Sequence, residues 1–598
     1  MKRSLLLVAA VALAATAPSV RNGFVYDDVP VVQRDPRIHR LDPRLVTLPY
    51  WGGDAEDRIY RPATTLSFAL DWALGGGRPA LFHATNVLLH AVVTALVLAL
   101  AARLLGAGAA LVAALLFAVH PVHLEAVASV VGRAELLAAL GYLVAVLGYI
   151  ADGDRRAQGG VSGGATLAVL LGATLAFGAK EHALTLPAAL VLTDVWMASR
   201  DGRPVIARWR SHGLLWTCVV VLGVGYLAAR SAVVGTATGG GHIAVGLEGL
   251  GAAGRAVVML PAVLVWTRLL IFPLHLSADY SPNAYPILSV MTVWHVIAVL
   301  LLVGGAALAW LARKRMPALW FALAWCAITA AVAANVLAPT GVTVAERVLY
   351  LPSVGFAIAA GALWERLPRG RPLWPLTSVA LTLLAARSLA RIPVWHDEGR
   401  FFAALERDAP DSYRTFWARG AREFDSGDAR AGEASYRQSL AIWPDPEVME
   451  ELGERFLSVG AWAPADRWST LAFRADSSRG SAAAKAVVAR MRGGHPDSAV
   501  AVGEAALRRF PAAPLLLLVT AEAWRQAGQP VRALTLERRA AFATPGEWQG
   551  QLAAASGAAR ARRCVEARMR VERGKALGGA AVSEGSVATI LAPCGEAR

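Results

Sequence analysis

The chain has 598 residues, of which 56% are hydrophobic, and its mean hydropathy is +0.46. This composition excludes an ordinary soluble protein, because several apolar runs approach the roughly 20 residues that cross a bilayer. The net charge of +15 does not indicate nucleic-acid binding, since much of the arginine lies in short loops between apolar runs, where basic residues set membrane topology.

The N-terminus carries a basic pair, Lys2 and Arg3, followed by an apolar run over residues 5–20. This pattern fits a retained first membrane helix, and it also fits a cleavable signal peptide, because residues 15–17 are Ala-Thr-Ala. In the first interpretation the N-terminus is cytoplasmic, and the chain emerges on the far side just before Asp27 and Asp28.

Two adjacent carboxylates, Asp27 and Asp28, open the first long loop, which covers residues 21–80. Like charges at this separation raise the pKa of one partner, which suits a general base. The alternative is a solvated turn behind a membrane anchor. The loop is long, polar and rich in Pro and Trp, and it is too long to be a mere connection.

The apolar runs predict eleven membrane crossings, with the N-terminus inside and the C-terminus outside. A further apolar stretch over residues 257–272 is interpreted as a re-entrant or interfacial helix, because both of its flanks belong outside. The crossings are expected at about residues 4–20, 82–105, 109–119, 136–150, 165–177, 184–198, 214–229, 292–311, 318–336, 353–364 and 374–389.

This topology separates two kinds of loop. Plain arginine clusters fall on the inner side, and motifs that mix acidic, basic, His and Tyr residues fall on the outer side. Ordinary loop charges are the simpler explanation, but ionisable groups near a membrane usually mark a functional site. The candidate site residues in the mixed motifs are Asp27, Asp28, Arg61, His120, His123, Glu125, Arg133, Lys180, Glu181, Asp279, Tyr280, Glu346 and Arg347.

The apolar runs stop near residue 400, and a helical repeat is expected over residues 399–573. Gly427, Gly460, Gly494 and Gly528 recur every 33 or 34 residues, which is the period of the tetratricopeptide repeat. Such repeats form a concave protein-binding surface, although a stacked spacer without a ligand has the same pattern. The last stretch, residues 574–598, is rich in Gly, Ala and Ser and is expected to be flexible.

The four cysteines have no metal-site spacing. Cys218 and Cys326 lie in apolar runs and are interpreted as small core residues. Cys564 and Cys594 lie in the C-terminal region, and they can pair if that region faces an oxidising compartment.

A site of carboxylates and cations on many helices can serve a substrate carried on a lipid. Sugar transfer from a lipid phosphate needs a carboxylate to take the acceptor proton, for which Asp27 or Asp28 is suited, and cations to hold the leaving phosphate, for which Lys180 and Arg347 are suited. The spacing of His120, His123 and Glu125 suits sugar binding or a divalent metal, but no further ligand set stands beside it, and no cofactor is expected.

Several of these motifs together carry a family resemblance. The stretches Y-D-D, Y-R-P, H-P-V-H-L-E-A-V, G-R-A-E, K-E, S-A-D-Y-S and A-E-R-V-L-Y-L-P-S resemble, in their order, the transmembrane and tetratricopeptide repeat-containing protein O-mannosyltransferases, which belong to the C-type glycosyltransferase superfamily. They begin at residues 26, 60, 120, 132, 180, 277 and 345. The similarity covers the membrane part, residues 1–398, and the order of the domains.

The resemblance implies an all-α fold, a polytopic helix bundle followed by a tetratricopeptide-like solenoid. It implies transfer of mannose from a polyprenyl-phosphate carrier to Ser or Thr of extracytoplasmic proteins, with the acidic pair Asp27 and Asp28 catalytic. It also favours a retained first helix. The Ala-, Gly- and Arg-rich composition indicates a bacterial member in the inner membrane, with periplasmic repeats. The rival functions are a transporter or flippase, and a non-catalytic scaffold whose repeats recruit partner proteins.

Overall fold

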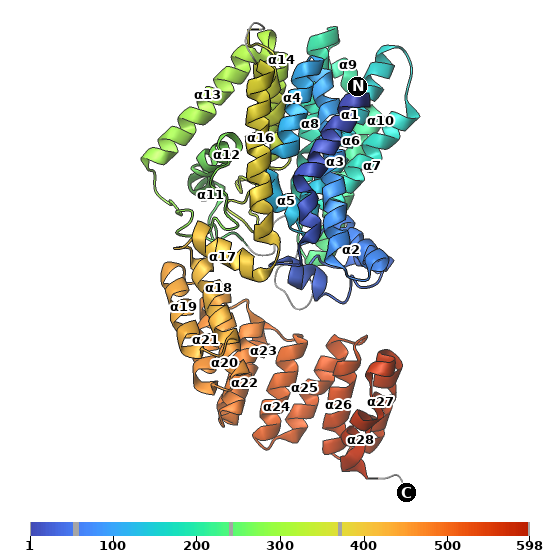
Figure 1. Ribbon diagram of the computed structural model, residues 1–598. Helices are drawn as coiled ribbons and strands as arrows, with labels where there is room; N and C mark the ends of the chain where they lie inside the picture. The colour runs from blue at the N-terminus through green and yellow to red at the C-terminus, as the bar shows by residue number, and fades with distance from the viewer. Residues whose placement is uncertain (1, 52–58, 238–242, 369–372, 596–598) are drawn as a thin grey trace. The chain divides into compact units, whose positions relative to one another are not determined.

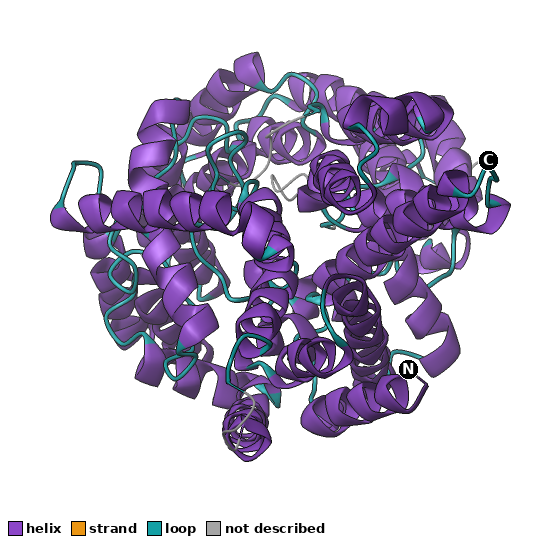
Figure 2. Cartoon of the chain, turned by 90° about the horizontal axis from the view of Figure 1, so that it is seen from above, coloured by secondary structure: helices purple, strands orange, loops and turns teal. Residues whose placement is uncertain are grey.

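The computed structural model describes residues 2–51, 59–237, 243–368 and 373–595, and all regular structure within these ranges is helical (Figures 1 and 2). The chain divides into two compact units, Met1–Ser412 and Tyr413–Arg598. The expected all-α fold is therefore confirmed. The division falls after residue 412 rather than after 398, because the helix Glu398–Asp408 groups with the first unit.

The first unit contains helices α1 to α17. Their bounds are α1 Lys2–Thr16, α2 Pro62–Gly75, α3 Pro79–Leu104, α4 Ala107–Val119, α5 Leu124–Ala128, α6 Arg133–Ala157, α7 Gly163–Ala179, α8 Leu186–Asp201, α9 Val205–Ser211, α10 Gly213–Val234, α11 Ala252–Met259, α12 Ala262–Ile271, α13 Val293–Arg315, α14 Pro317–Ala330, α15 Pro352–Trp364, α16 Leu373–Arg391 and α17 Glu398–Asp408.

A helix is present at each of the eleven predicted crossings. By length and composition, six of the described helices can span a membrane, or up to eight if each of two bent pairs is a single span. Three further apolar helices, α7, α14 and α15, are shorter. The second bent pair, α11 with α12, turns by 40° and occupies the stretch interpreted as re-entrant.

The core of the first unit is formed by helices that approach one another closely. At the crossing of α6 and α7, a Cβ on Gly141 would lie 2.5 Å from the carbonyl oxygen of Gly172, so only glycine fits. Fully buried aromatic side chains such as Phe117, Tyr142 and Trp325 fill the space between the neighbouring helices. Dense packing of this kind fixes the helix ends, and with them the loops that carry the charged motifs.

The second unit is a stack of helix pairs that begin at residues 413, 446, 480, 514 and 548, a spacing of 33 or 34 residues. This is the solenoid that the glycine period predicts, and all four glycines have a positive φ, between +74° and +91°, at the turns inside the first four pairs. The bounds are α18 Tyr413–Asp425, α19 Ala429–Ile442, α20 Pro446–Ser458, α21 Trp462–Ala475, α22 Gly480–Arg492, α23 Pro496–Arg509, α24 Pro514–Gln526, α25 Pro530–Ala543, α26 Trp548–Arg560 and α27 Cys564–Gly578.

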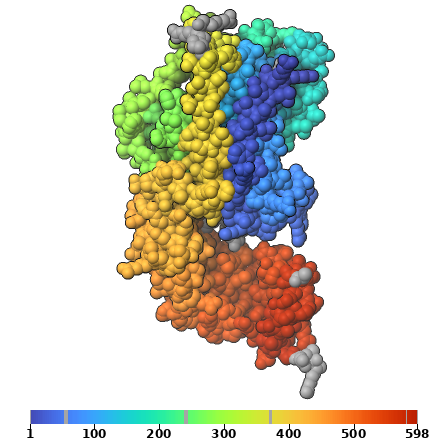
Figure 3. Space-filling view, in the orientation of Figure 1, coloured from blue at the N-terminus to red at the C-terminus, as the bar shows by residue number. Residues whose placement is uncertain are grey.

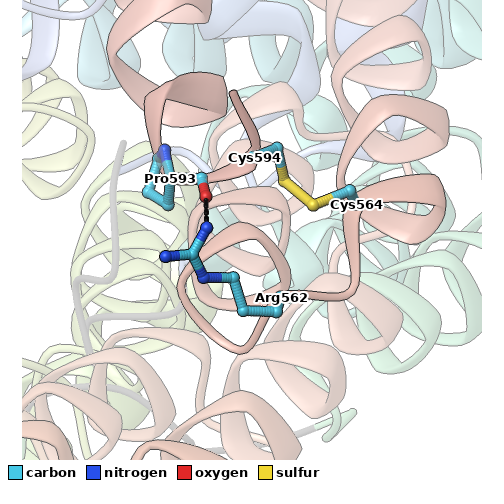
Figure 4. Close-up of a disulfide and its surroundings, with 4 residues drawn as sticks. All are labelled: Arg562, Cys564, Pro593 and Cys594. Atoms are coloured by element: carbon cyan, nitrogen blue, oxygen red, sulfur yellow. Dashed lines mark hydrogen bonds between the residues drawn. A yellow bond between two sulfur atoms is a disulfide. The ribbon is translucent and has the colours of Figure 1, made fainter. Parts of the chain in front are cut away.

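The C-terminal stretch differs from the flexible tail expected over residues 574–598. The structure gives it the end of α27 and a further helix, α28 Glu584–Leu591. A disulfide between Cys564 and Cys594 joins the start of α27 to the residues after α28, and Figure 4 shows it beside Arg562. The cross-link and the packing of Val587 against Leu552 and Val571 order a segment whose composition alone indicates disorder.

Candidate functional site

The mixed motifs meet at one end of the first unit, which we call the site end. Asp28 anchors the first long loop, which begins at residue 21, to residues 129–131 at this end. This side chain is 1% exposed, and its carboxylate accepts hydrogen bonds from the backbone N–H groups of Val130 (3.1 Å) and Val131 (2.8 Å) and from the Ser129 hydroxyl (3.2 Å). Burial raises the pKa of Asp28 to about 7, although these backbone hydrogen bonds oppose the rise.

Asp27 differs from its neighbour because its side chain is only half-buried. The preceding residue, Tyr26, has a φ of +56°, which turns the backbone sharply between the two acidic residues and the first helix. The negative charge of Asp27 acts to raise the pKa of both Asp28 and Arg347. The structure thus separates the tandem carboxylates into a buried anchor and a more accessible acid beside a cation.

Arg347 lies in the single turn Arg347–Leu349, 222 residues after its partner Glu125 in sequence. Its backbone N–H and its Nη1 donate to the two carboxylate oxygens of Glu125, at 2.8 and 2.9 Å. Burial lowers the pKa of Arg347, but the carboxylates of Glu125 and Asp27 outweigh this effect and raise it above its usual range. The guanidinium therefore stays charged at the site end.

Two more ion pairs lie at the same end. Arg61 donates to Glu181 with Nη2 at 2.9 Å and with Nε at 3.2 Å. Lys180 pairs with Glu135 at the start of α6. Burial lowers the pKa of Lys180, Glu135 opposes this, and the positive charges of Arg61 and Arg347 lower it further. The three cations Arg61, Lys180 and Arg347 therefore lie near one another, each paired with its own carboxylate, and we call them the electropositive group.

Tyr50 is a candidate site residue that the sequence did not reveal. It is 3% exposed, its ring lies under the guanidinium of Arg61 at 5.2 Å, and its hydroxyl has no hydrogen-bond partner among the described residues. Nearby charges affect the pKa of this hydroxyl: those of Arg61 and Arg347 lower it, and those of Asp27 and Asp28 raise it. A buried hydroxyl without a partner costs free energy unless a ligand satisfies it. A lone loop tyrosine carries no motif that could have identified it.

The two histidines predicted to orient a substrate already have protein partners. His120 Nε2 bonds to the carbonyl of Leu270 at 2.9 Å, and His123 Nε2 bonds to the Ser353 hydroxyl at 2.7 Å. Both rings are buried. Within the described ranges, no group of three or more His, Cys, Asp or Glu side chains is arranged to hold a metal ion.

Arg133 lies inside the helix junction, with its side chain fully buried. Its Nε donates to Asn86 Oδ1 at 2.9 Å, its Nη2 donates to the carbonyl of Phe82 at 2.8 Å, and it forms an ion pair with Asp71 at 2.6 Å. The geometry gives it the role of joining α2, α3 and α6 rather than that of a direct substrate contact.

The remaining candidates, Asp279, Tyr280 and Glu346, form a second cluster. Glu346 Oε1 accepts hydrogen bonds from the Tyr280 hydroxyl at 2.8 Å and from the Ser277 N–H at 2.6 Å. Burial raises the pKa of Glu346 to about 8. Asp279 bonds to the hydroxyl of Ser281 at 2.6 Å and also to that of Ser412. This cluster fixes the loop that precedes Arg347.

These features define a class of protein: an α-helical, multi-pass membrane protein with a charged site at one end of its bundle and a repeat unit that follows in sequence. No family model matches the sequence. Curated relatives do. Protein O-mannosyl-transferase TMTC4 of Homo sapiens is 28% identical over 488 residues, covering 72% of this chain and 65% of that protein.

Two further relatives are also named protein O-mannosyl-transferases. Protein O-mannosyl-transferase TMTC2 of Mus musculus is 31% identical over 306 residues, 48% of this chain and 36% of the relative. Protein O-mannosyl-transferase F38B6.6 of Caenorhabditis elegans is 24% identical over 461 residues, which cover 74% of this chain and 63% of that protein. The chain spans less than two thirds of the length of these relatives. The resemblance to the protein O-mannosyltransferases that its motifs carry is thereby confirmed.

Solved structures of repeat proteins align with part of the chain. PilF of Pseudomonas aeruginosa has a TM-score of 0.27 and 15% identity, covering 36% of this chain and 94% of PilF. The tetratricopeptide repeat protein TTC0263 of Thermus thermophilus has a TM-score of 0.24 and 17% identity, and the alignment covers 31% of this chain and 98% of TTC0263.

Proposed function

We propose that this protein is a membrane glycosyltransferase that moves a sugar, mannose, from a polyprenyl-phosphate carrier to Ser or Thr hydroxyls of acceptor proteins. The observation that carries the proposal is the position of Asp27, an accessible acid beside the buried Asp28 and within electrostatic reach of Arg347. The names of the relatives, protein O-mannosyl-transferases, support mannose as the sugar and protein as the acceptor.

Asp27 is the general base in this proposal. Its carboxylate takes the proton of the acceptor hydroxyl while the hydroxyl oxygen forms a bond to the anomeric carbon of the sugar. The bond between that carbon and the phosphate oxygen breaks, and the electron pair leaves with the polyprenyl phosphate. Asp28 takes no proton from the acceptor. It holds the loop, because its oxygens are already bonded to residues 129–131.

The electropositive group of Arg61, Lys180 and Arg347 stabilises the departing phosphate. Fixed cations placed before the reaction need no reorganisation as negative charge develops on the leaving group. Each cation is held by its own carboxylate, Glu181, Glu135 or Glu125, so the three charges keep their positions. The Tyr50 hydroxyl is free to donate to the same phosphate or to the sugar. The chemistry requires no cofactor.

The repeat unit is proposed to recruit acceptor proteins. Stacked helix pairs present an extended surface on which a peptide chain can lie. The disulfide between Cys564 and Cys594 supports an oxidising compartment for this unit, and therefore an extracytoplasmic location. The Ala-, Gly- and Arg-rich composition supports a bacterial inner membrane as the site of the first unit. The repeats and the Asp27 loop would then lie on the same side of that membrane.

The test is transfer of labelled mannose from a polyprenyl-phosphate carrier to protein in proteoliposomes. The wild-type protein is expected to transfer label, and Asp27→Asn is expected to reduce transfer by about a hundredfold or more while folding is preserved. Asp397→Asn, which removes a carboxylate that caps α17 at the surface, is the matched control. Wild-type protein that transfers no sugar would refute the proposal. Unchanged transfer by Asp27→Asn would refute the assignment of the base.

A further inference from the structure

Two arginine side chains outside the electropositive group meet on the short loop over residues 272–276. Arg268 of α12 donates from Nη1 to the carbonyl of His275 at 3.1 Å. Arg387 of α16 donates from Nε and Nη2 to the carbonyl of Leu274, at 3.1 and 2.9 Å. Within the described ranges, neither guanidinium has a carboxylate oxygen within the 4.0 Å of an ion pair. Each guanidinium therefore carries a charge that no carboxylate balances at ion-pair distance, and each has spare N–H groups for a ligand.

The loop around these arginines is apolar and exposed. Ile271, Phe272 and Leu274 are 52%, 65% and 65% exposed. In water, such a patch beside two unpaired cations would be costly. At the boundary of a bilayer it suits a molecule that combines a phosphate with a hydrocarbon chain, because the cations bind the phosphate while the apolar side chains contact the hydrocarbon.

The neighbouring helix α13 leaves room for such a chain. It packs against α14, and at its N-terminal end His295 Nε2 bonds to the carbonyl of Val257 at 3.0 Å. Between these ends, residues 299–304 are all exposed. Six consecutive residues cover more than one full turn, so at this level no side of α13 is covered by protein. In a membrane, lipid must therefore lie on the inner side of α13 as well as on the outer side.

Helix α16 has the same property along most of its length. Only 6% of its apolar window is buried, against 78% for α6. In Figure 1, α13 leans away from α16, and in Figure 3, α16 (yellow) lies open on the surface of the first unit. The apolar side chains Leu376, Val379 and Leu383 of α16 are exposed. Two weakly packed helices thus flank the approach to Arg268 and Arg387.

The two arginines adjoin the candidate active site. Leu270, two residues after Arg268, accepts a hydrogen bond from His120. The guanidinium of Arg268 lies within electrostatic reach of the Tyr280 hydroxyl. That hydroxyl donates a hydrogen bond to Glu346, which directly precedes Arg347 in sequence. A phosphate bound by Arg268 and Arg387 would thus lie next to the loop that carries Arg347.

We propose that Arg268 and Arg387 bind the phosphate of the incoming lipid-linked sugar donor, before Arg61, Lys180 and Arg347 stabilise that phosphate as it departs, and that the polyprenyl chain of the donor lies between α13 and α16. This inference rests on the proposed function. It adds a donor-binding surface with two cations that lie outside every charged motif of the sequence.

The test uses the full-length protein in phosphatidylcholine nanodiscs, with undecaprenyl phosphate as the probe and native mass spectrometry to measure binding. The variant is Arg268→Gln with Arg387→Gln, because glutamine keeps a hydrogen-bond donor for the loop carbonyl but removes the charge. Arg210→Gln, at an exposed arginine of α9, is the matched control. We expect wild type and control to bind equally, and the double variant to bind about tenfold more weakly or worse, with a KM for the donor raised to a similar extent.

Equal binding by the double variant would overturn the inference. Competition by phosphatidylglycerol at equal concentration would also overturn it, because the surface would then be a general site for anionic lipids. Failure of the proposed function gives a different result, since the wild type would bind the probe and yet transfer no mannose to protein.

Discussion

The carboxylate of Glu125 holds Arg347 at two points, the backbone N–H at 2.8 Å and the guanidinium Nη1 at 2.9 Å. This contact joins α5 to the turn before α15 and sets the direction of the Arg347 side chain. Charge-assisted hydrogen bonds of this type are roughly twice as strong as neutral ones and more demanding in geometry.

Replacement of Glu125 by Gln should impair both stability and transfer. Glutamine still offers an oxygen to the backbone N–H of Arg347. It lacks the negative charge with which the carboxylate balances the guanidinium. We expect a loss of about 1–3 kcal/mol in the free energy of unfolding, as for hydrogen bonds to charged groups. Sugar transfer should fall about tenfold or more. Thermal unfolding in detergent and the mannose assay measure the two effects, with the exposed Glu398→Gln as control. Unchanged transfer would show that Arg347 does not depend on Glu125.

Asp28 predicts a particular dependence of stability on pH. Its pKa is about 7 in the folded protein, above the ordinary value of 3.8, so the folded state binds the proton more tightly than the unfolded chain. Stability is therefore expected to fall as pH rises from about 4 to about 7, by at most about 1.4 kcal/mol per pH unit. Glu346 titrates in the same direction, so the comparison is between wild type and Asp28→Asn. The variant should lose less stability between about pH 5 and about pH 8. Parallel curves would contradict the assignment to Asp28.

Tyr50→Phe tests the unpartnered hydroxyl. Phenylalanine keeps the ring under Arg61 and removes only the oxygen, so folding should be unaffected or slightly improved. We expect kcat/KM for the donor to fall about tenfold, which corresponds to about 1.4 kcal/mol. Tyr60→Phe is the matched control, because the Tyr60 hydroxyl is bonded to the carbonyl of Val46 at 2.7 Å. That variant should lose stability and keep transfer. Full activity of Tyr50→Phe would remove this hydroxyl from the site.

The sequence predicted what depends on local pattern. Apolar runs indicated the helices, and the recurrence of Gly427, Gly460, Gly494 and Gly528 indicated the solenoid, because a positive φ at a tight turn favours glycine and the turn recurs at a fixed spacing. The different environments of Asp27 and Asp28 could not be predicted, since the partners of Asp28 are backbone N–H groups a hundred residues away. Tyr50, Arg268 and Arg387 were missed for the same reason. Their surroundings arise only from tertiary packing.

The disulfide gives a prediction for the end of the solenoid. Cys564 and Cys594 close a loop with a sequence separation of 30, and loss of a cross-link of this size costs about 3.6 kcal/mol. Cys564→Ser with Cys594→Ser should therefore speed the proteolysis of α28 in the full-length protein, and reductant should have the same effect on the wild type. Sugar transfer by the first unit is not expected to require the bond. Equal protease resistance of the oxidised wild type and the double variant would show that packing alone orders this segment.

Arg562 offers the most specific test of the repeat architecture. It lies 34 residues after Gly528, at the same turn of the fifth helix pair, and it has a φ of +58° where the other pairs have glycine. A non-glycine residue in the left-handed region costs about 1–2 kcal/mol. Its Nη1 also donates to the carbonyl of Pro593, as Figure 4 shows.

Comparison of glycine and alanine at position 562 separates these two effects. Both variants lose the bond to Pro593, and only Arg562→Gly relieves the backbone strain. We therefore expect Arg562→Gly to be more stable than Arg562→Ala by about 1 kcal/mol, which is the cost of a side chain at a left-handed position. Gly528→Ala in the fourth pair should cost a similar amount. Calorimetry of the purified protein and proteolysis of the last helices measure the differences. If the glycine and alanine variants are equally stable, the turn of the fifth pair does not adopt the conformation of the other four.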